Sequence, residues 1–337
     1  RPRFMKILIV SHIPTHPTNA GNRSCMMSYA ELLVRMGHQV ELLYLHMPWT
    51  TGGDSLEPMR DWWGTGYHQF TQSDIDRLAQ LVHHKLCFRV FKRYSLDAHL
   101  PFGAASHLAK LVAAQGYQAV IVNYWAYSGL FEMLPKGVKR VLYTHDRFGD
   151  RFQTTGGGWL STDKATEGKA FDRSHVVLAI QEEEAVQFRK QTTSQVMVSY
   201  SPFEVVSLPV SGTRNILYLA SGNPNNVQGL RRFVSEVLPL LLASDASIRL
   251  LVGGRVCQMV HDLGGVPGLV LQGEVGDLAD FYAQGDVVVN PVFTGSGLKI
   301  KTFEAMAFGR MVVCDPHSME GIYRPDFAPV RACASPM

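Results

Sequence analysis

Apolar residues along the chain form two series of short continuous runs, with helix-like stretches between many of them. In the first half these runs cover residues 5–10, 40–45, 118–122, 139–143, 175–179 and 195–198. Continuous apolar runs of this length are typical of strands that are buried on both faces of a parallel sheet. Helical stretches such as 23–36 separate several of them, so we predict a doubly wound α/β sheet.

Two segments of the first half do not follow this pattern. Residues 46–72 are rich in Gly, Trp and Thr and have no clear period, while residues 80–94 interleave basic and apolar side chains. We predict that both segments are elaborations outside the sheet.

A second series of runs begins at Asn215. It predicts strands at 215–220, 248–252, 269–271, 286–290 and 311–314, and helices at 227–242, 277–284 and 299–308. The stretch 199–214 holds two prolines, Gly212 and several serines without helical periodicity, as a linker does. We therefore predict two Rossmann-like domains, residues 1–205 and 206–337.

Composition and charge narrow the class of protein. The five cysteines lie far apart without any C-x-x-C, which favours a reducing, cytoplasmic setting over a disulfide framework or a zinc knuckle. The net charge of +3 is too small to indicate a basic surface that binds nucleic acid. Residues 1–200, however, carry 22 Lys and Arg against 17 Asp and Glu. Together with the basic and apolar segment 80–94, this predicts a peripheral contact with the anionic inner face of a membrane, the alternative being charges that are scattered and solvated.

The strongest chemical signal is the stretch 290–309, NPVFTGSGLKIKTFEAMAFG, where a glycine-rich turn joins a strand to a helix. Glycines let backbone N–H groups approach phosphate oxygens, and a helix N-terminus adds unpaired donors and a favourable dipole. A lysine in the first turn supplies a full positive charge. The stretch therefore predicts a diphosphate site, formed by Gly295, Ser296, Gly297, Leu298 and Lys299.

This stretch resembles the donor-site signature of the GT-B glycosyltransferases of the group 1 family. The resemblance implies that Lys299 contacts the diphosphate and that Glu304 holds the ribose hydroxyls of the donor. A simpler alternative for Glu304 is an ion pair with Lys301 at i, i+3.

The resemblance continues through the loops of the second half. It assigns donor-binding roles to Gly222 and Asn226, and it places the backbone of Gly273 and Val275 against the base. Plain strand-to-helix turns would explain these loops equally well.

In the first half, Gly21 stands in the family's glycine-rich loop, and the strand 139–143 runs into His145 and Asp146. In the family, a His-Asp pair at this strand end reaches the transferred sugar. An imidazole there can donate a hydrogen bond to a sugar hydroxyl or to the leaving oxygen, while Asp146 can fix its tautomer or meet the acceptor. We therefore assign catalysis to His145, Asp146 and Lys299, the alternative being a hydrogen-bonded loop histidine.

Four residues are candidates for binding the acceptor. Tyr124 and Trp125 follow a strand at the sheet edge where sugars commonly stack on rings, although core packing would explain them equally well. Arg147 and Arg151 follow the His-Asp pair and suit an anionic acceptor, or they are simply solvated.

Three features depart from the family pattern. Ser296 stands where many members have the first acid of a Glu-x7-Glu pair, and the loop 221–229, SGNPNNVQG, lacks the usual Arg and Lys. The phosphate charge must then rest on Lys299, with Lys301 and backbone donors as further candidates. The chain stops at Met337, before the final helices usual in such folds, so we expect either a short native tail or absent residues.

The sequence thus predicts a GT-B enzyme with two Rossmann-like domains facing each other across a cleft. It would move a sugar from a nucleoside-diphosphate sugar to a glycan or lipid-linked acceptor, in cell-surface polysaccharide or glycoconjugate synthesis. The resemblance implies retention of anomeric configuration, and we expect neither a metal nor a cofactor. The alternatives are a degenerate module that binds a nucleotide or a partner without turnover, and a sugar-nucleotide 2-epimerase.

Overall fold

The computed structural model of the chain describes residues 4–18, 21–47, 55–90, 96–151, 160–294, 298–322 and 325–333. The chain divides into two compact units, Arg1–Pro202 and Phe203–Met337. The sequence placed this division between residues 205 and 206. In the described part of the chain, no helix is both long enough and apolar enough to cross a membrane.

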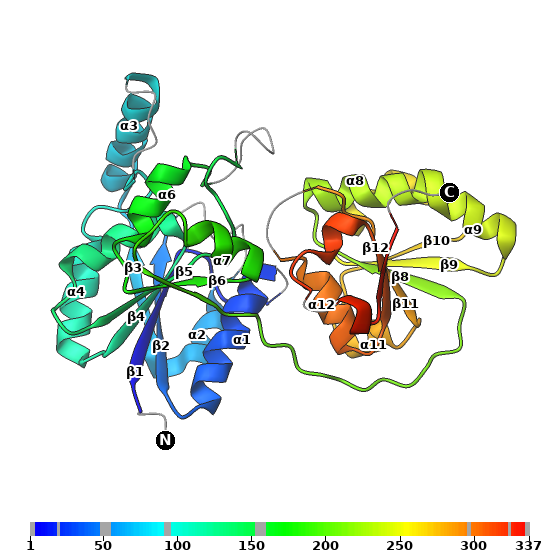
Figure 1. Cartoon of the computed structure of the whole chain (residues 1–337), viewed down its shortest axis with the longest axis horizontal. Coiled ribbons are helices and arrows are strands. Elements are labelled where there is room, and N and C mark those ends of the chain that lie inside the picture. Colours follow the sequence, from blue (N-terminus) through cyan, green and yellow to red (C-terminus); the bar gives the residue numbers. More distant parts are fainter. Residues whose placement is uncertain are drawn as a thin grey trace. The chain divides into compact units, whose positions relative to one another are not determined.

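The first unit is built on a seven-stranded parallel sheet (Figure 1). In sheet order, its strands are β3 (Tyr67–Thr71), β2 (Gln39–His46), β1 (Lys6–Ser11), β4 (Ala119–Asn123), β5 (Lys139–Tyr143), β6 (Val176–Ala179) and β7 (Gln195–Val198). The order reverses direction between β1 and β4, and ligands of such sheets bind beyond the carboxyl ends of the strands at this point.

Strand β3 corrects the prediction that residues 46–72 lie outside the sheet. Its register pairs Leu42 of β2 with Tyr67 and His46 with Thr71, so it forms the edge of the sheet beside β2. The sequence YHQFT contains only two aromatic residues among polar ones, and none of the five is fully buried. An edge strand of this kind lacks the apolar run by which the central strands were recognised.

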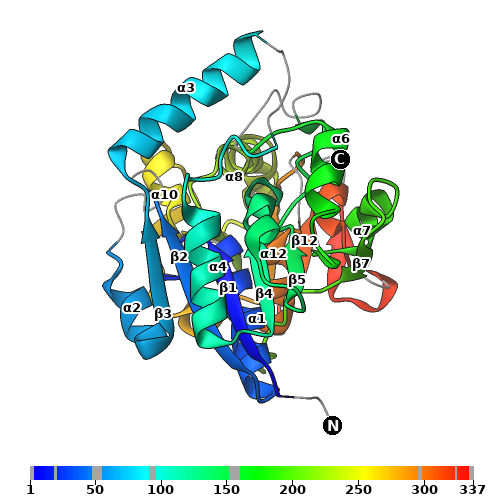
Figure 2. The same cartoon turned by 90° about the vertical axis from the view of Figure 1, so that its left-hand side faces the viewer.

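The first unit has helices on both faces of its sheet and one further helix, α3, that projects away from the sheet (Figure 2). They are α1 (Gly21–Arg35), α2 (Glu57–Trp63), α3 (Asp74–Val90), α4 (Ala104–Gln115), α6 (Lys164–Phe171) and α7 (Glu182–Phe188). Leu8 and Val10 of β1 pack in one apolar cluster with Leu108 of α4, while Ile7 and Ile9, which point to the opposite face, are buried as well. Burial on both faces explains the continuous apolar run of β1.

The second unit is a six-stranded parallel sheet. In sheet order, its strands are β10 (Leu269–Gly273), β9 (Arg249–Gly253), β8 (Asn215–Leu219), β11 (Val287–Asn290), β12 (Met311–Cys314) and β13 (Val330–Ala332). The short edge strand β13 was not predicted, because only its first residue is buried. The order reverses between β8 and β11, which places a second switch point there.

One long helical segment covers one face of this sheet. It consists of α8 (Pro224–Arg232), the π-helical turn η3 (Phe233–Val237) and α9 (Leu238–Ser244). Pro239 lacks the N–H that would bond the carbonyl of Ser235, and a π-type turn before it accommodates the missing bond.

The helices on the two faces enclose separate apolar clusters. Leu230 and Phe233 pack against β8, β9 and β11 with residues of α10 (Val256–Met259). On the other face, α11 (Leu278–Tyr282) and α12 (Ile300–Ala307) contribute Phe281 and Ala305 to a second cluster. The second unit is therefore also doubly wound.

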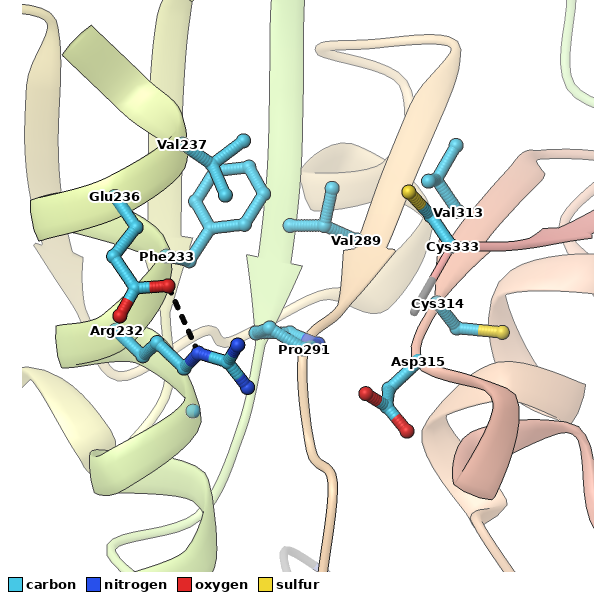
Figure 3. Close-up of a pocket in the computed structure, with 11 residues that line it drawn as sticks. Arg232, Phe233, Glu236, Val237, Val289, Pro291, Val313, Cys314, Asp315 and Cys333 are labelled. Carbon is cyan, nitrogen blue, oxygen red and sulfur yellow. Dashed lines mark hydrogen bonds and ion pairs between the residues drawn. The ribbon is translucent and has the colours of Figure 1, made fainter. Parts of the chain in front are cut away.

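A cavity of about 140 Å³ lies beside α8 and η3 in the second unit (Figure 3). Most of its lining is apolar, including Phe233, Val289 and Val313. Its charged groups are Asp315 and the Arg232–Glu236 ion pair, whose N–O distance is 3.0 Å.

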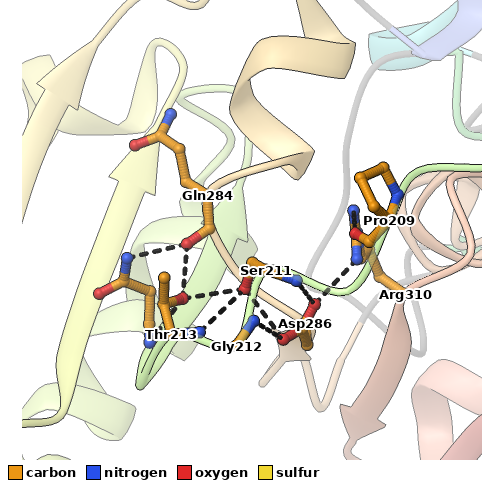
Figure 4. A network of polar contacts seen from close by, with 8 residues as sticks. Pro209, Ser211, Gly212, Thr213, Gln284, Asp286 and Arg310 are labelled. Carbon is orange, nitrogen blue, oxygen red and sulfur yellow. Dashed lines mark hydrogen bonds and ion pairs between the residues drawn. The ribbon is translucent and has the colours of Figure 1, made fainter.

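Asp286 fixes the segment that enters the second unit (Figure 4). Its carboxylate accepts hydrogen bonds from the backbone N–H of Ser211 at 2.7 Å and of Gly212 at 3.0 Å. Arg310, only 2% exposed, donates to Asp286 at 2.9 Å and to the carbonyl of Pro209 at 3.0 Å. The backbone N–H of Ser211 is the main cause of a lowered pKa at Asp286, with further hydrogen bonds and Arg310 adding to it.

We expect Asp286→Ala to destabilise the second unit by about 2 kcal/mol, because it leaves the buried Arg310 guanidinium without its carboxylate. All five tryptophans lie in residues 1–202, so tryptophan fluorescence follows the first unit and circular dichroism follows both. Urea unfolding should show a shifted circular dichroism transition and an unchanged fluorescence transition. The solvent-exposed pair Arg231–Asp262 supplies the control, since Asp262→Ala should shift neither transition appreciably.

This stabilisation should also depend on pH. Because the pKa of Asp286 is lower in the folded than in the unfolded protein, its contribution is present above the unfolded pKa and is lost as the pH falls through the folded pKa. The difference between wild type and Asp286→Ala should therefore shrink in strong acid. An equal difference at neutral and strongly acidic pH would contradict this assignment.

Candidate functional site

Two lysines, Lys299 and Lys301, lie where β8, α8 and α12 meet in the second unit. We call them, with Asn226 and Tyr218, the cationic cluster. Lys301 of α12 donates a hydrogen bond from Nζ to Oδ1 of Asn226 on α8. The same amine lies 5.3 Å from the ring centroid of Tyr218, at the end of β8. The Tyr218 hydroxyl donates to the carbonyl of Asn226 at 3.0 Å, so all three residues are tied together.

The orientation of the Asn226 amide is fixed by its other contacts. Its Nδ2 donates to the carbonyl of Ser221 at 3.0 Å and lies 3.1 Å from the Ser221 hydroxyl. Because a carbonyl can only accept, Nδ2 must face Ser221 and Oδ1 must face the amine of Lys301. Asn226 therefore holds Lys301 through a neutral contact.

Burial, with the charge of Lys299 as a second cause, lowers the pKa of Lys301 to about 7. Lys299 is 7% exposed and occupies the N-cap position of α12. No carboxylate of the described residues forms an ion pair with Lys301. A buried amine without an opposite charge costs free energy, so an anion at this position would be strongly favoured.

Glu304 lies one turn further along α12 than Lys301 but does not pair with it. Oε1 of Glu304 accepts a hydrogen bond from the Tyr282 hydroxyl at 2.8 Å, whereas Lys301 is bonded to Asn226. The i, i+3 ion pair considered from the sequence is therefore not formed. Burial raises the pKa of the Glu304 carboxyl.

The loops beyond the carboxyl ends of β8, β9 and β10 carry the other predicted donor residues. Gly222 follows β8, Gly273 ends β10 with φ +79°, and Val275 follows it. Between them, Gly254 has φ +93°, and a Cβ there would lie 2.3 Å from the carbonyl oxygen of Ala220, so only glycine lets these two loops approach. Leu298 and Lys299 belong to the described part of the glycine-rich turn. Gly295, Ser296 and Gly297 lie outside the described residues.

In the first unit, the carboxyl ends of β4 and β5 bring Asn123 and His145 together. Nε2 of His145 lies 2.6 Å from Oδ1 of Asn123, while Nδ2 of Asn123 donates to the carbonyl of Val10 at 2.9 Å. Since Oδ1 must accept, Nε2 of His145 carries the proton and Nδ1 is left as an acceptor. Of the two roles that the sequence left open for Asp146, fixing the tautomer of His145 therefore falls to Asn123 instead.

His145 is also held by aromatic rings. It stacks on Tyr124 with ring centroids 4.5 Å apart, and the edge of Tyr143 lies against it at 4.6 Å. Its φ of 63° is unusual for a residue with a side chain and marks a constrained position. Desolvation lowers the pKa of His145 to about 3, so the imidazole is neutral throughout the physiological pH range.

Asp146 interacts with the two arginines that follow it in the sequence. Its carboxylate accepts from the backbone N–H of Arg147 at 2.7 Å and lies 3.4 Å from Arg151. Arg147 is exposed, and the guanidinium of Arg151 lies 5.3 Å from the ring of Phe148. An acceptor approaching this loop would therefore meet a partly neutralised charge cluster.

The two predicted acceptor aromatics are buried. Tyr124 and Trp125 are each 2% exposed, and the indole N–H of Trp125 donates to the carbonyl of Leu160 at 3.0 Å. This burial favours the packing role that the sequence left open. The other predicted glycine of this unit, Gly21, is the first residue of α1.

Two buried carboxyls behind the His145–Asp146 loop were not found from the sequence. Oε1 of Glu167 accepts from the backbone N–H of Phe148 at 2.8 Å, and burial raises the pKa of Glu167 to about 7. Burial, with the nearby charge of Asp146, also raises the pKa of Glu184. Glu167 on α6 and Glu184, the last of three successive glutamates that begin α7, look like surface residues in the sequence, and only the fold reveals that they lie under this loop.

The described residues contain no group of three or more His, Cys, Asp or Glu side chains that could hold a metal ion. The apolar cavity of Figure 3 does not include Lys301, Asn226 or Lys299 either, so the cationic cluster and not the cavity is the candidate phosphate site.

Comparison with known proteins gives the same architecture. Residues 213–324 match the family described as glycosyl transferases group 1. An uncharacterized 44.6 kDa protein in the cps region of Klebsiella pneumoniae is 26% identical over 119 residues, which are 32% of this chain and 30% of that protein. The chain thus matches less than a third of the length of this curated relative.

Solved structures match over nearly the whole chain. TarM of S. aureus has a TM-score of 0.66 at 12% identity and is matched over 97% of this chain and 87% of TarM. HepE of Anabaena, solved with UDP and glucose, has a TM-score of 0.62 at 12% identity, over 97% of this chain and 86% of HepE. At these identities the likeness concerns the fold. Most of the second unit is thus similar to group 1 glycosyl transferases, and the chain as a whole has the GT-B fold.

Proposed function

We propose that this protein is a glycosyltransferase that binds a nucleoside-diphosphate sugar in its second unit and passes the sugar to a glycan or lipid-linked acceptor. The observation that carries this proposal is the buried amine of Lys301, held by the neutral amide of Asn226 with Lys299 beside it. The N-termini of α8 and α12 add positive potential to the same place. A diphosphate would supply the opposite charge that the Lys301 amine does not find in its bond to Asn226.

The solved relatives are consistent with such a donor. HepE was solved with UDP and glucose, and TarM with UDP and α-GlcNAc-glycerol. The relative from a cps region supports a role in cell-surface polysaccharide synthesis. We extend these features to this chain as a proposal, together with retention of anomeric configuration.

Catalysis would depend on the stabilisation of the departing diphosphate. Negative charge grows on the leaving oxygen in the transition state, and preorganised donors such as Lys301 and Lys299 stabilise it without reorganising. His145 would act on the sugar. Its free Nδ1 can accept a hydrogen bond from a sugar hydroxyl, which replaces the donating role expected from the sequence.

We further propose that transfer needs no divalent metal, since lysines bind the phosphates. Activity that is lost with a chelator and restored by manganese would contradict this.

A thermal-shift screen of nucleoside diphosphates and their sugar conjugates tests the donor proposal. A ligand present at about 100 times its dissociation constant adds about 2.7 kcal/mol of stability. Transfer of labelled sugar to an acceptor extract then separates the alternatives. Binding without any turnover would favour a degenerate module, and a changed sugar without an acceptor would favour an epimerase.

We expect Lys301→Met to weaken nucleoside-diphosphate binding about ten- to a hundredfold, the value of a charge-assisted hydrogen bond. Arg249→Met is the matched control, because Arg249 lies at the amino-terminal end of β9, whereas Lys301 contacts Tyr218 near the carboxyl end of β8, and this variant should leave affinity unchanged. Titration calorimetry measures both. Equal affinities for Lys301→Met and wild type would remove Lys301 from the site.

Asn226→Asp gives a sharper test of the missing charge. The substitution keeps the size of the side chain but gives Lys301 an internal carboxylate, which would compete with the diphosphate. We expect nucleoside-diphosphate affinity to fall about tenfold or more. Gln228→Glu adds the same charge to an exposed position of α8 and should have little effect. If the two variants weaken binding equally, the effect is general repulsion and not loss of the Lys301 site.

His145→Ala and Lys299→Ala should fail in different ways, because they lie in different units and serve different parts of the donor. Lys299→Ala should weaken binding of the bare nucleotide about ten- to a hundredfold and lower turnover further. His145→Ala should leave nucleotide affinity nearly unchanged while lowering turnover about a hundredfold. Calorimetry with the nucleotide and initial rates with its sugar conjugate distinguish them. Weakened nucleotide binding in both variants would contradict this division of roles.

A further inference from the structure

Helix α3 exposes an unusual number of large apolar side chains. Ile75 is 82% exposed, Leu78 65%, and Leu81, Val82 and Leu86 are each about half exposed. The helix has 17 residues and projects from the body of the first unit (Figures 1 and 2). Isolated exposed apolar residues are ordinary, but a group on one element marks a contact surface.

The polar and apolar sides of α3 are reversed relative to an ordinary surface helix. Ile75, Leu78, Val82 and Leu86 follow the i, i+3, i+7, i+11 spacing of a single helical face. Asp76 and Gln80 lie on another side and are partly buried. Gln80 donates to the carbonyl of Ala98 at 2.9 Å and accepts from Gln72 at 2.6 Å. The polar side therefore contacts the protein, and the apolar side faces away from it.

The acidic and basic residues of α3 lie in different parts of the helix. The acids Asp74 and Asp76 are confined to the first turn, and no further Asp or Glu follows until Asp97. Between them the sequence places Arg77, Lys85 and Arg89 on the helix. Beyond the first turn, the charged residues of α3 are all cations, and an apolar face with such neighbours matches a surface that is both anionic and apolar.

We propose that α3 docks the protein onto an anionic membrane, lying in the interface with Ile75, Leu78, Val82 and Leu86 inserted. A lipid bilayer offers acyl chains to this face and anionic headgroups to the neighbouring Lys and Arg side chains. A helix of 17 residues is about 25 Å long and would lie along the surface. Pairing with a second copy of α3 would instead bring two sets of cations together. The proposal refines the peripheral contact expected for residues 80–94 and does not rest on glycosyl transfer.

Vesicle flotation tests this docking, with mixed phosphatidylglycerol and phosphatidylcholine vesicles compared with phosphatidylcholine alone. We expect the protein to partition onto the anionic vesicles at least about tenfold more strongly. The double variant Leu78→Glu/Val82→Glu should lower partitioning onto anionic vesicles at least about tenfold, because it places charges where apolar groups insert. Lys85→Gln should lower it about fivefold.

The control is Met133→Glu/Val186→Glu, which changes two side chains of the first unit that are 55% and 42% exposed, and it should float like wild type. Unchanged tryptophan fluorescence and nucleotide thermal shifts would show that every variant is folded. Wild-type protein that does not float with anionic vesicles, or α3 variants that float like wild type, would overturn the proposal. So would a Leu78→Glu/Val82→Glu variant that dissociates an oligomer in sedimentation experiments without changing flotation, because the apolar face of α3 would then be a contact between copies.

Discussion

The amine of Lys301 is buried against an amide and an aromatic ring, without a carboxylate among its described partners. Removing a charge from water costs free energy unless an opposite charge compensates, and here part of that cost is reduced by lowering the pKa to about 7. Strands β8 and β11 and helices α8 and α12 hold the groups around this amine. The second unit thus maintains an incomplete electrostatic site, which an anion would complete.

The first unit holds a neutral group in place of a buried charge. Its central group, His145, is neutral because desolvation lowers its pKa to about 3, and Asn123 holds it in one tautomer. Glu167 fixes the loop behind it through the backbone of Phe148. Cations that suit a phosphate lie in one unit, and a neutral hydrogen-bonding group that suits a sugar lies in the other. This separation is what supports a division between donor binding and sugar handling.

The sequence predicted the parts of the structure that leave a local signal. Central strands such as β1 and β11 are apolar because both of their faces are buried, and the glycine-rich turn before α12 pointed to a cationic phosphate site. Edge strands β3 and β13 left no such run. From the sequence, Lys301 was only a further candidate for the phosphate site. Its partner Asn226 is 75 residues away, and no local pattern shows which lysine faces it. The Asn123–His145 bond and the buried Glu167 depend in the same way on contacts that form only in the folded chain.

Proton uptake on binding tests the central claim most directly. At about pH 8 a free nucleoside diphosphate is fully ionised, whereas Lys301, with a pKa of about 7, is mostly neutral until an anion arrives. Titration calorimetry in two buffers of different ionisation enthalpy measures the protons exchanged. If Lys301 meets the diphosphate, wild-type protein should take up close to one proton at this pH, and Lys301→Met should take up none. Binding without proton uptake, or uptake that persists in Lys301→Met, would contradict the account.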